Sequence, residues 1–168
     1  MLSSNVCRYL IGFFCLCFIG FGCTLKSVDT RETGSSDQGA PRILIAYQQS
    51  KFKRALVADI RTALQKKQYY IKMIDVKALR SESVQNYHAV VIINKCMAGR
   101  PDPRVEDYIF EVPQKDKIIL LTTGYMDAWK PESPEVDAMT SASKLAESNR
   151  IAQIITGKVT DLIESKSM

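Results

Sequence analysis

Histidine and cysteine are scarce in the main part of this chain. His88 is the single histidine among 168 residues, and four of the five cysteines lie within the first 23 residues, which leaves only Cys96. A disulfide framework needs several cysteines in the folded part, and a zinc site needs clustered ligands. The sequence therefore predicts neither. It also lacks a catalytic-triad pattern, so no catalytic residue is predicted and the question of enzymatic activity stays open.

The chain has no apolar run long enough for a comfortable membrane span. Its longest run, residues 9–22, contains 14 apolar or small residues, whereas a transmembrane helix needs about 20. The run follows a short segment with one arginine and no acidic residue. This combination is typical of a signal peptide, whose apolar part is shorter than a membrane span.

The end of this run, Gly22-Cys23, resembles the bacterial lipoprotein signal, in which a small residue precedes a cysteine that becomes lipid-modified. Gly22 fits that pattern, while Gly20 stands where the family prefers leucine. The resemblance implies a signal peptide over 1–22, a lipid such as palmitate on Cys23, and export to the bacterial cell envelope with a membrane anchor. The alternatives are an uncleaved anchor and an ordinary secretory signal that is cut nearby.

Large apolar side chains are almost absent from residues 24–41, which are rich in glycine, serine, threonine and charges. Such a segment cannot bury enough surface to offset its chain entropy, so a flexible tether is predicted over residues 23–41. The net charge of the whole chain is +5. This permits an anionic or protein partner, but no interleaved basic and aromatic patch is present, so no nucleic-acid partner is predicted.

Residues 42–168 alternate short apolar runs with amphipathic segments, which is typical of a parallel α/β domain. From Phe52 onward, apolar residues recur every four positions, so a helix of about 16 residues is predicted with Ser50 as its N-cap and with Lys53 on the solvent side. Further helices are expected near residues 104–110 and 142–163. Strands are expected at 43–47, 70–76, 89–93 and 117–121, and a fifth at 136–139 is either short or absent.

Four segments of this domain resemble the flavodoxin-like family: RILIAYQQS, YIKMIDV, NYHAVVIINK and KIILLTTG. The resemblance covers residues 42–165. It implies a three-layer α/β/α fold with a parallel sheet in the order 2-1-3-4-5. It also implies FMN as a candidate cofactor, because flavodoxins hold the FMN phosphate in the loop after the first strand with hydroxyl groups, a glycine and the amides of a helix N-terminus.

The loop after the first strand departs from that pattern. No glycine occurs between Gly39 and Gly99, and Ser50 supplies the only hydroxyl. Three basic residues, Lys51, Lys53 and Arg54, lie at a helix N-terminus, where cations are disfavoured. Either a bound anion offsets that cost, or these side chains are solvated charges on a loop that has lost its ligand.

The carboxyl ends of the strands provide the other candidate positions, because open α/β sheets bind ligands there. Tyr125 and Trp129 either flank a flavin ring or pack a loop onto the sheet. The predicted residues for flavin or anion binding are Gln48, Gln49, Ser50, Lys51, Asn94, Lys95, Thr123, Gly124 and Tyr125.

The stretch DAMTSAS, residues 137–143, resembles the acceptor signature D-x-x-[ST]-G-A-[TS], to which a flavin transferase joins FMN through a phosphoester. Asp137, Thr140 and Ala142 match, and Ser141 stands where glycine is usual. The resemblance implies Ser143 as the attachment point. The alternative is N-cap chemistry at the start of the last helix.

These observations predict a membrane-tethered, exported lipoprotein whose flavodoxin-like domain has a binding or interaction role. The alternative is an FMN-binding electron-transfer protein or small flavin oxidoreductase. A third hypothesis is a scaffold without a small ligand, whose basic face meets an anionic partner.

Overall fold

The computed structural model describes residues 28–35, 37, 39–96, 100–124 and 136–165. The predicted signal peptide, Cys23, Tyr125 and Trp129 lie outside these residues. In chain order the elements are β1 (Arg31–Thr33), β2 (Arg42–Tyr47), α2 (Lys51–Gln65), β3 (Tyr70–Asp75), η1 (Val76–Ser81), η2 (Val84–Asn86), β4 (Ala89–Lys95), α3 (Pro103–Glu111), η3 (Lys115–Lys117), β5 (Ile118–Gly124), β6 (Asp137–Ala142), η4 (Leu145–Glu147) and α4 (Ser148–Ser165), where η denotes a 3-10 helix.

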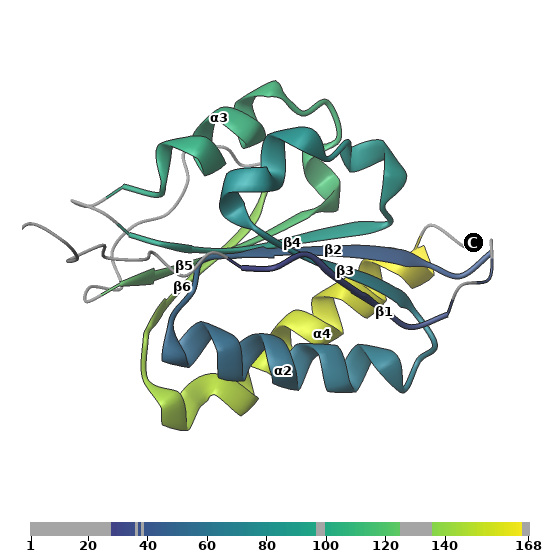
Figure 1. The fold of residues 1–168 in the computed structure, drawn as a ribbon, viewed down its shortest axis with the longest axis horizontal. Coiled ribbons are helices and arrows are strands. Elements are labelled where there is room, and N and C mark those ends of the chain that lie inside the picture. The colour runs from purple at the N-terminus through teal and green to yellow at the C-terminus, as the bar shows by residue number, and fades with distance from the viewer. Residues whose placement is uncertain (1–27, 36, 38, 97–99, 125–135, 166–168) are drawn as a thin grey trace, which may run out of the picture.

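The centre of the molecule is a six-stranded sheet in the order β1-β3-β2-β4-β5-β6. The five strands from β3 to β6 in that row run parallel. They reproduce the predicted order 2-1-3-4-5, since β2 is the first strand of the predicted domain. Helices α2 and α4 lie on one side of the sheet, and α3 with the η1 segment lies on the other (Figure 1). The predicted three-layer α/β/α class is therefore confirmed.

An additional strand extends the sheet at the β3 edge, and here the structure differs from the tether expected over residues 23–41. Arg31–Thr33 pairs antiparallel with β3, and the backbone N–H of Val28 donates to Asp75 Oδ2 at 3.0 Å. Gly34 turns the chain after β1 with a φ of +105°, and a Cβ there would lie 2.0 Å from the carbonyl oxygen of Tyr69. Backbone pairing thus orders part of a segment that has little apolar surface to bury.

The fifth parallel strand forms and is longer than expected. β6 covers Asp137–Ala142 and pairs along its whole length with β5. The prediction that this strand is short or absent is wrong, because pairing with the exposed edge of β5 supplies hydrogen bonds that the local sequence does not reveal. The last helix consequently starts at Ser148, after η4, and not near residue 142.

The central strands β2, β4 and β5 are buried on both faces, as their continuous apolar runs predict. Alternate residues of β2 separate two cores: Ile43 and Ile45 pack toward α2 and α4, while Leu44 and Ala46 pack toward α3 and η1. All four side chains are fully buried. This rigid strand carries the loop that follows it, so the position of that loop is set by the core. No helix in the described residues is long and apolar enough to cross a membrane.

One prediction for α2 is wrong. Ser50 is its N-cap, as expected, because its side-chain oxygen accepts from the N–H of Lys53 at 3.1 Å. Lys53, however, does not face solvent and is only 3% exposed. It lies four and seven residues before Val57 and Ile60, which places its side chain on the same face of the helix as those buried residues.

Candidate functional site

A cavity of about 930 Å³ opens at the carboxyl edge of the parallel strands. It lies beside the β2–α2 loop and between the ends of β3, β4, β5 and β6. This is the edge at which open α/β sheets place their ligands. Its lining residues are Gln48, Gln49, Ser50, Phe52, Lys53, Asp75, Lys77, Lys95, Arg104, Thr123, Gly124, Ala142, Ser143 and Lys144.

The structure brings most of the predicted site residues together in this cavity. Lys51 is exposed and is not part of the lining, Asn94 is fully buried behind it, and Tyr125 lies outside the described residues. The predicted residues that do line the cavity are Gln48, Gln49, Ser50, Lys95, Thr123, Gly124 and Ser143.

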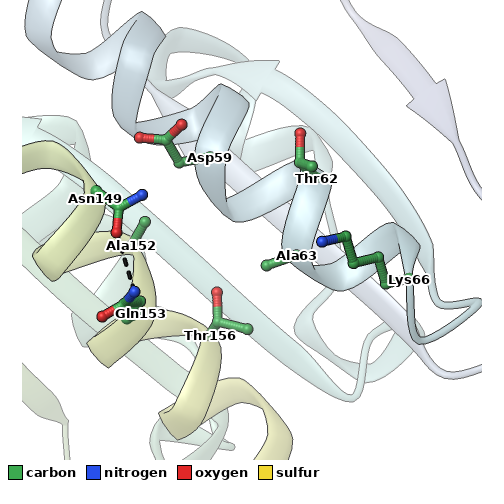
Figure 2. A pocket seen from close by; sticks show the side chains of 8 residues that line it. All are labelled: Asp59, Thr62, Ala63, Lys66, Asn149, Ala152, Gln153 and Thr156. Carbon is green, nitrogen blue, oxygen red and sulfur yellow. Dashed lines mark hydrogen bonds between the residues drawn. The ribbon is translucent and has the colours of Figure 1, made fainter.

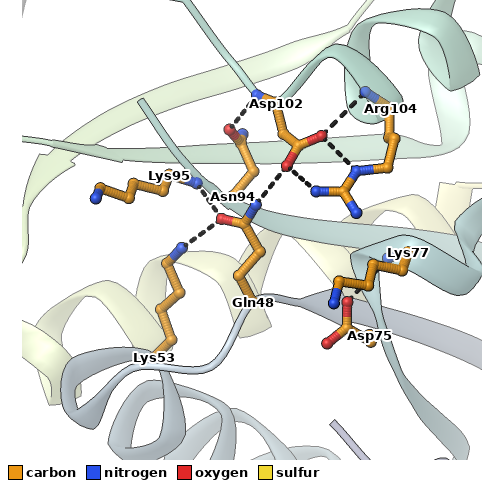
Figure 3. A network of polar contacts seen from close by, with 8 residues as sticks. All are labelled: Gln48, Lys53, Asp75, Lys77, Asn94, Lys95, Asp102 and Arg104. Carbon is orange, nitrogen blue, oxygen red and sulfur yellow. Dashed lines mark hydrogen bonds and ion pairs between the residues drawn. The ribbon is translucent and has the colours of Figure 1, made fainter. Parts of the chain in front are cut away.

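Gln48 connects the first loop to the neighbouring strand and helix (Figure 3). Its Oε1 accepts from Lys53 Nζ at 3.1 Å and from the backbone N–H of Lys95 at 2.8 Å. Its Nε2 donates to Asp102 Oδ2 at 2.7 Å. These three bonds hold the glycine-free loop in place, because they join the end of β2 to α2, β4 and the start of α3.

Asp102 and Arg104 form the strongest ion pair of this region. Arg104 donates from Nε to Oδ1 at 2.8 Å and from Nη2 to Oδ2 at 2.7 Å, so the pair is bidentate. The hydrogen bond from Arg104 lowers the pKa of Asp102 below its usual value despite the burial of the carboxylate. Asp102 is 2% exposed, and it also caps α3 by accepting from the backbone N–H of Arg104. Its charge is therefore already satisfied by Arg104.

A second, fully buried set of polar contacts supports the cavity from behind. Asn94 Oδ1 accepts from the backbone N–H of Asp102 at 3.3 Å, and Asn94 Nδ2 donates to Thr122 Oγ1 at 3.0 Å. The hydroxyl of Thr123 donates to the carbonyl oxygen of Asn94 at 3.0 Å. Asn94 thus fixes the relative positions of β4, β5 and the start of α3, and in this structure it does not face a ligand.

The N-terminus of α2 borders the cavity, and its first N–H groups have no partner within the helix. Ser50 satisfies the N–H of Lys53, so its oxygen is already engaged in capping. A Ser50 hydroxyl that accepts one bond can still donate another. The loop therefore offers an anion one hydroxyl donor together with the positive end of the helix dipole.

Lys53 is the most unusual side chain of the site. Its pKa is lowered to about 8, chiefly by burial and also by repulsion from Lys95, while attraction to Asp102 opposes both effects. Its ammonium donates to the neutral amide oxygen of Gln48. Among the described residues, no carboxylate forms an ion pair with Lys53. A buried cation without a paired anion is unfavourable for folding.

Positive charge dominates the lining of the cavity. Four basic side chains besides Lys53 contribute to it, whereas Asp75 is its one acidic residue among the described residues. Lys77 and Arg104 follow the ends of β3 and β4 in the chain, so the carboxyl edge of the sheet was a signal that could have identified them. Lys144 could not be found in this way, because the extent of β6 was not predicted. The added basic residues are Lys77, Lys95, Arg104 and Lys144.

The stretch that resembles a flavin acceptor forms β6 and the turn after it. Asp137 pairs with Lys158 of α4 at 2.6 Å, and Ser143 lines the cavity. The N-cap alternative does not apply to this stretch, because α4 begins at Ser148. Ser143 is thus placed beside the cationic lining, and its modification stays a prediction.

His88 and Cys96 make contacts that hold strands together. His88 Nδ1 accepts from the backbone N–H of Arg42 at 3.0 Å, which ties β2 to the start of β4. Cys96 lies close to Gly124, where a Cβ would come within 2.9 Å of the Cys96 Cβ. Gly124 is therefore required for this close approach at the end of β5. No group of histidine, cysteine and carboxylate side chains within the described residues could hold a metal ion.

A second hollow of about 420 Å³ lies between α2 and α4, far from the predicted site residues (Figure 2). Its lining mixes alanines with polar side chains, and Gln153 Nε2 donates to Asn149 Oδ1 within it. Lys66 and Asp59 balance each other in charge. This hollow follows from the packing of two helices with small side chains at their contact, and it gathers no charge of one sign.

Comparison with known proteins identifies the fold. No protein-family model matches the chain, and no curated protein matches it. Among solved structures, it is similar to the oxidised flavodoxin 2 from Bacillus cereus, with a TM-score of 0.51 and 12% identity over 71% of this chain and 98% of that one. The reduced flavodoxin from Megasphaera elsdenii gives a TM-score of 0.52 and 10% identity over 71% and 98%. The chain has a flavodoxin-like fold.

A larger protein contains the same fold. The flavodiiron core from Synechocystis matches with a TM-score of 0.56 and 10% identity, over 76% of this chain but only 37% of that core. At such low identities, the likeness establishes the flavodoxin-like fold alone and carries no function to this chain.

The cavity has side chains that suit the phosphate of FMN, but its first loop lacks most of the groups with which flavodoxins hold that phosphate. Its basic side chains suit a phosphate, and the α2 N-terminus adds free N–H groups. The glycine and most hydroxyl donors of the flavodoxin pattern are missing, and Phe52 is the single aromatic residue of the described lining. The donor set thus supports an anion, held mainly by lysine and arginine.

Proposed function

We propose that the flavodoxin-like domain is a binding module that holds an anionic small molecule at the carboxyl edge of its sheet. The observation that carries this proposal is the lining of the 930 Å³ cavity, which has five basic side chains and one acidic one, and of the five basic side chains Arg104 is paired with Asp102. Such a cluster repels itself, and a bound anion would relieve the repulsion. The module would act at a membrane surface to which the chain is tethered, and no catalytic step is assigned to it.

FMN is the specific ligand we propose for the second candidate function, that of an electron-transfer protein or small flavin oxidoreductase. The fold shared with flavodoxins and the cationic cavity favour it. Ser50 and the N–H groups of α2 would hold the phosphate together with Lys77, Lys95 or Lys144, and Thr123 with Gly124 would border the flavin. Bound FMN would supply one- or two-electron redox chemistry. The chain would contribute binding, orientation and the positive charge around the cofactor.

Calorimetric titration of the full chain in mild detergent, with inorganic phosphate, FMN and riboflavin in separate experiments, tests both candidates. Saturable binding of phosphate and FMN, and binding of riboflavin at least about tenfold weaker, is the expected result, because riboflavin lacks the phosphate. Lys144→Gln should weaken FMN binding, whereas Lys51→Gln should not, since Lys51 lies at the same helix end but outside the cavity. Absence of saturable binding for all three compounds would refute the proposed function.

The visible spectrum of the purified chain separates the two candidates. A yellow protein with flavin absorption would support the electron carrier. Binding of phosphate without uptake of FMN would remove it and leave the anion-binding module. Flavin fluorescence that survives denaturing electrophoresis, and that disappears in Ser143→Ala, would establish covalent attachment at Ser143. Fluorescence that is lost on denaturation of the wild type would refute such attachment.

We propose further that the domain is exported and anchored by a lipid on Cys23. The Gly22-Cys23 junction after the apolar run supports this localisation. In a bacterial host, the wild type should fractionate with membranes and should accumulate as a larger precursor when the lipoprotein signal peptidase is inhibited. The Cys23→Ser variant should leave the membrane fraction. Unchanged membrane fractionation of Cys23→Ser would contradict the lipid anchor.

A further inference from the structure

Lys53 brings an amine to the inner wall of the cavity. It occupies the third position of α2, and its residue is 3% exposed even though it lines the cavity. The rigid strand β2 and the capped start of α2 position it. Gln48 holds its nitrogen by one hydrogen bond at 3.1 Å, and Figure 3 shows the Lys53 side chain rising from the helix toward Gln48.

The charges that face Lys53 disfavour its protonated form. Lys95 at the end of β4 repels it, and the N-terminal end of α2 carries the positive pole of the helix dipole. Asp102 before α3 attracts Lys53, but both oxygens of its carboxylate already accept hydrogen bonds from Arg104. With a pKa of about 8, roughly a tenth of Lys53 is a neutral amine at pH 7.

A neutral amine is a nucleophile toward carbonyl carbon, and a lysine becomes reactive in this way when it is desolvated beside another cation. Lys53 meets both conditions. The cavity adds a third element, because Lys77 and Lys144 line the same space and can hold a negatively charged group. A molecule that carries an anionic group and a carbonyl group would be bound by the first set of side chains and presented to the amine.

We propose that Lys53 forms an imine with small phosphorylated aldehydes bound in this cavity. The amine lone pair attacks the carbonyl carbon, and the resulting carbinolamine loses water as the C=N bond replaces the C=O bond. The amine hydrogens and the carbonyl oxygen leave together as that water, and no oxidant or reductant takes part. This inference rests on the proposed anion-binding function, because the phosphate would be held by the same basic side chains.

The alternative without covalent chemistry is that Lys53 remains an ammonium group and only adds to the binding of the anion. The two roles differ in a measurable way. If Lys53 stays an ammonium group, it would bind the phosphate and form no covalent adduct. If it acts as a nucleophile, it would form an imine faster than any exposed lysine of the chain. Lys51, two residues away on the same helix and exposed, provides the internal comparison.

Pyridoxal 5′-phosphate is a suitable probe, since it joins an aldehyde to a phosphate. The full chain is incubated with it at pH 7 in mild detergent, the imines are reduced with borohydride, and the labelled peptides are quantified by mass spectrometry. Lys53 should be labelled at least about tenfold faster than Lys51. Pyridoxal without the phosphate should label it at least about tenfold more slowly, and excess inorganic phosphate should protect it. Lys53→Arg should lose this adduct, whereas Lys51→Arg should keep it.

Labelling of Lys53 no faster than that of Lys51 would overturn the inference, and this comparison within the wild type does not depend on the folding of a variant. If calorimetry still shows phosphate binding in that case, the proposed function stands without the imine. If neither phosphate binding nor selective labelling occurs, both proposals fail. Equal labelling by pyridoxal and its phosphate would leave a reactive lysine but would refute the phosphorylated class of substrate.

Discussion

Lys53 and Lys72 show how differently one chain can treat two shielded lysines. Lys72 on β3 donates to Glu82 at 2.8 Å and lies 3.8 Å from Glu32. The hydrogen bond to Glu82 raises the pKa of Lys72, whereas burial lowers that of Lys53. Tyr87 belongs to the cluster around Lys72, because its hydroxyl donates to the second oxygen of Glu82 at 2.5 Å.

The difference separates a structural cluster from a candidate site. Around Lys72, each charge meets its opposite, so the cluster stabilises the fold at neutral pH without any ligand. Around Lys53, basic side chains line the cavity, and the Asp102 carboxylate that attracts Lys53 is paired with Arg104. Uncompensated charge at a cavity costs stability, and such costs are characteristic of functional sites.

Replacing Lys53 by methionine should stabilise the domain. Lys53→Met removes a buried charge and keeps most of the side-chain volume, so the free energy of unfolding at pH 7 should rise by about 2 kcal/mol. Because the pKa is lower in the folded state, the unfolded chain binds more protons between pH 8 and 10.5, and the stability of the wild type rises across that window.

The gain from Lys53→Met should therefore shrink between pH 8 and 10.5. Urea unfolding followed by circular dichroism at pH 7 and pH 10 measures it. The matched variant Lys72→Met should instead destabilise the domain at pH 7, because it leaves Glu82 without its cation. A loss of stability in both variants would break the proposed contrast.

Replacing Glu82 by glutamine should destabilise the structural cluster by about 1.5 kcal/mol at pH 7. Burial alone raises the pKa of Glu82, but the hydrogen bonds from Lys72 and Tyr87, with the charge of Lys72, outweigh it and leave the pKa below its usual value. This contribution is present above the unfolded pKa and is lost as the pH falls through the folded pKa.

Wild type and Glu82→Gln should therefore converge in stability as the pH falls through the lowered folded pKa of Glu82. Chemical unfolding at pH 7 and at pH 3 checks this, with Glu111→Gln as the control, because the Arg80–Glu111 pair is exposed and contributes little. An equal difference between wild type and Glu82→Gln at both pH values would show that the ion pair is not its cause.

Removing the Gln48 side chain, which connects the first loop to Lys53 and Asp102, should have the smallest effect on stability. Gln48→Ala deletes the acceptor of Lys53 and the donor to Asp102. The free energy of unfolding should fall by about 1 kcal/mol, since the amide is partly shielded and water can replace some of its bonds. Binding of phosphate should weaken as the loop loses its position.

Gln49→Ala is the matched control for this variant, because Gln49 also lines the cavity but, within the described part of the chain, its side chain bonds only to the exposed Arg54. Denaturant unfolding and phosphate calorimetry of both variants measure the two effects. Full phosphate affinity in Gln48→Ala would contradict the positioning role of Gln48.

The sequence predicts those elements whose pattern is local. The apolar run Ile43–Tyr47 must be a buried strand, and Ser50 before an apolar-periodic segment is a helix cap. β1 and the full length of β6 cannot be predicted in this way, because their polar sequences are ordered by pairing with β3 and β5, far along the chain. Pairing between distant segments leaves no local pattern.

Half of the candidate site could be predicted from the rule that ligands bind at the carboxyl edge of the strands, which pointed to Gln48, Lys95 and Thr123. The charge of Lys53 favours the solvent side, although its spacing from Val57 and Ile60 places it on the buried face. Lys144 could be located only once β6 was known. Residue type misled at Lys53, where helical spacing was the better guide.

An NMR titration of isotope-labelled lysine side chains shows directly whether the cations at the carboxyl edge of the sheet bind an anion. Lys53→Arg and Lys72→Arg assign the two resonances, and sulfate serves as the probe because its charge is constant over the titration. We expect Lys53 to titrate near pH 8 without sulfate and distinctly higher with it, and Lys72 to stay above the ordinary lysine value in both cases. A Lys53 that titrates with the exposed lysines and does not respond to sulfate would contradict the account.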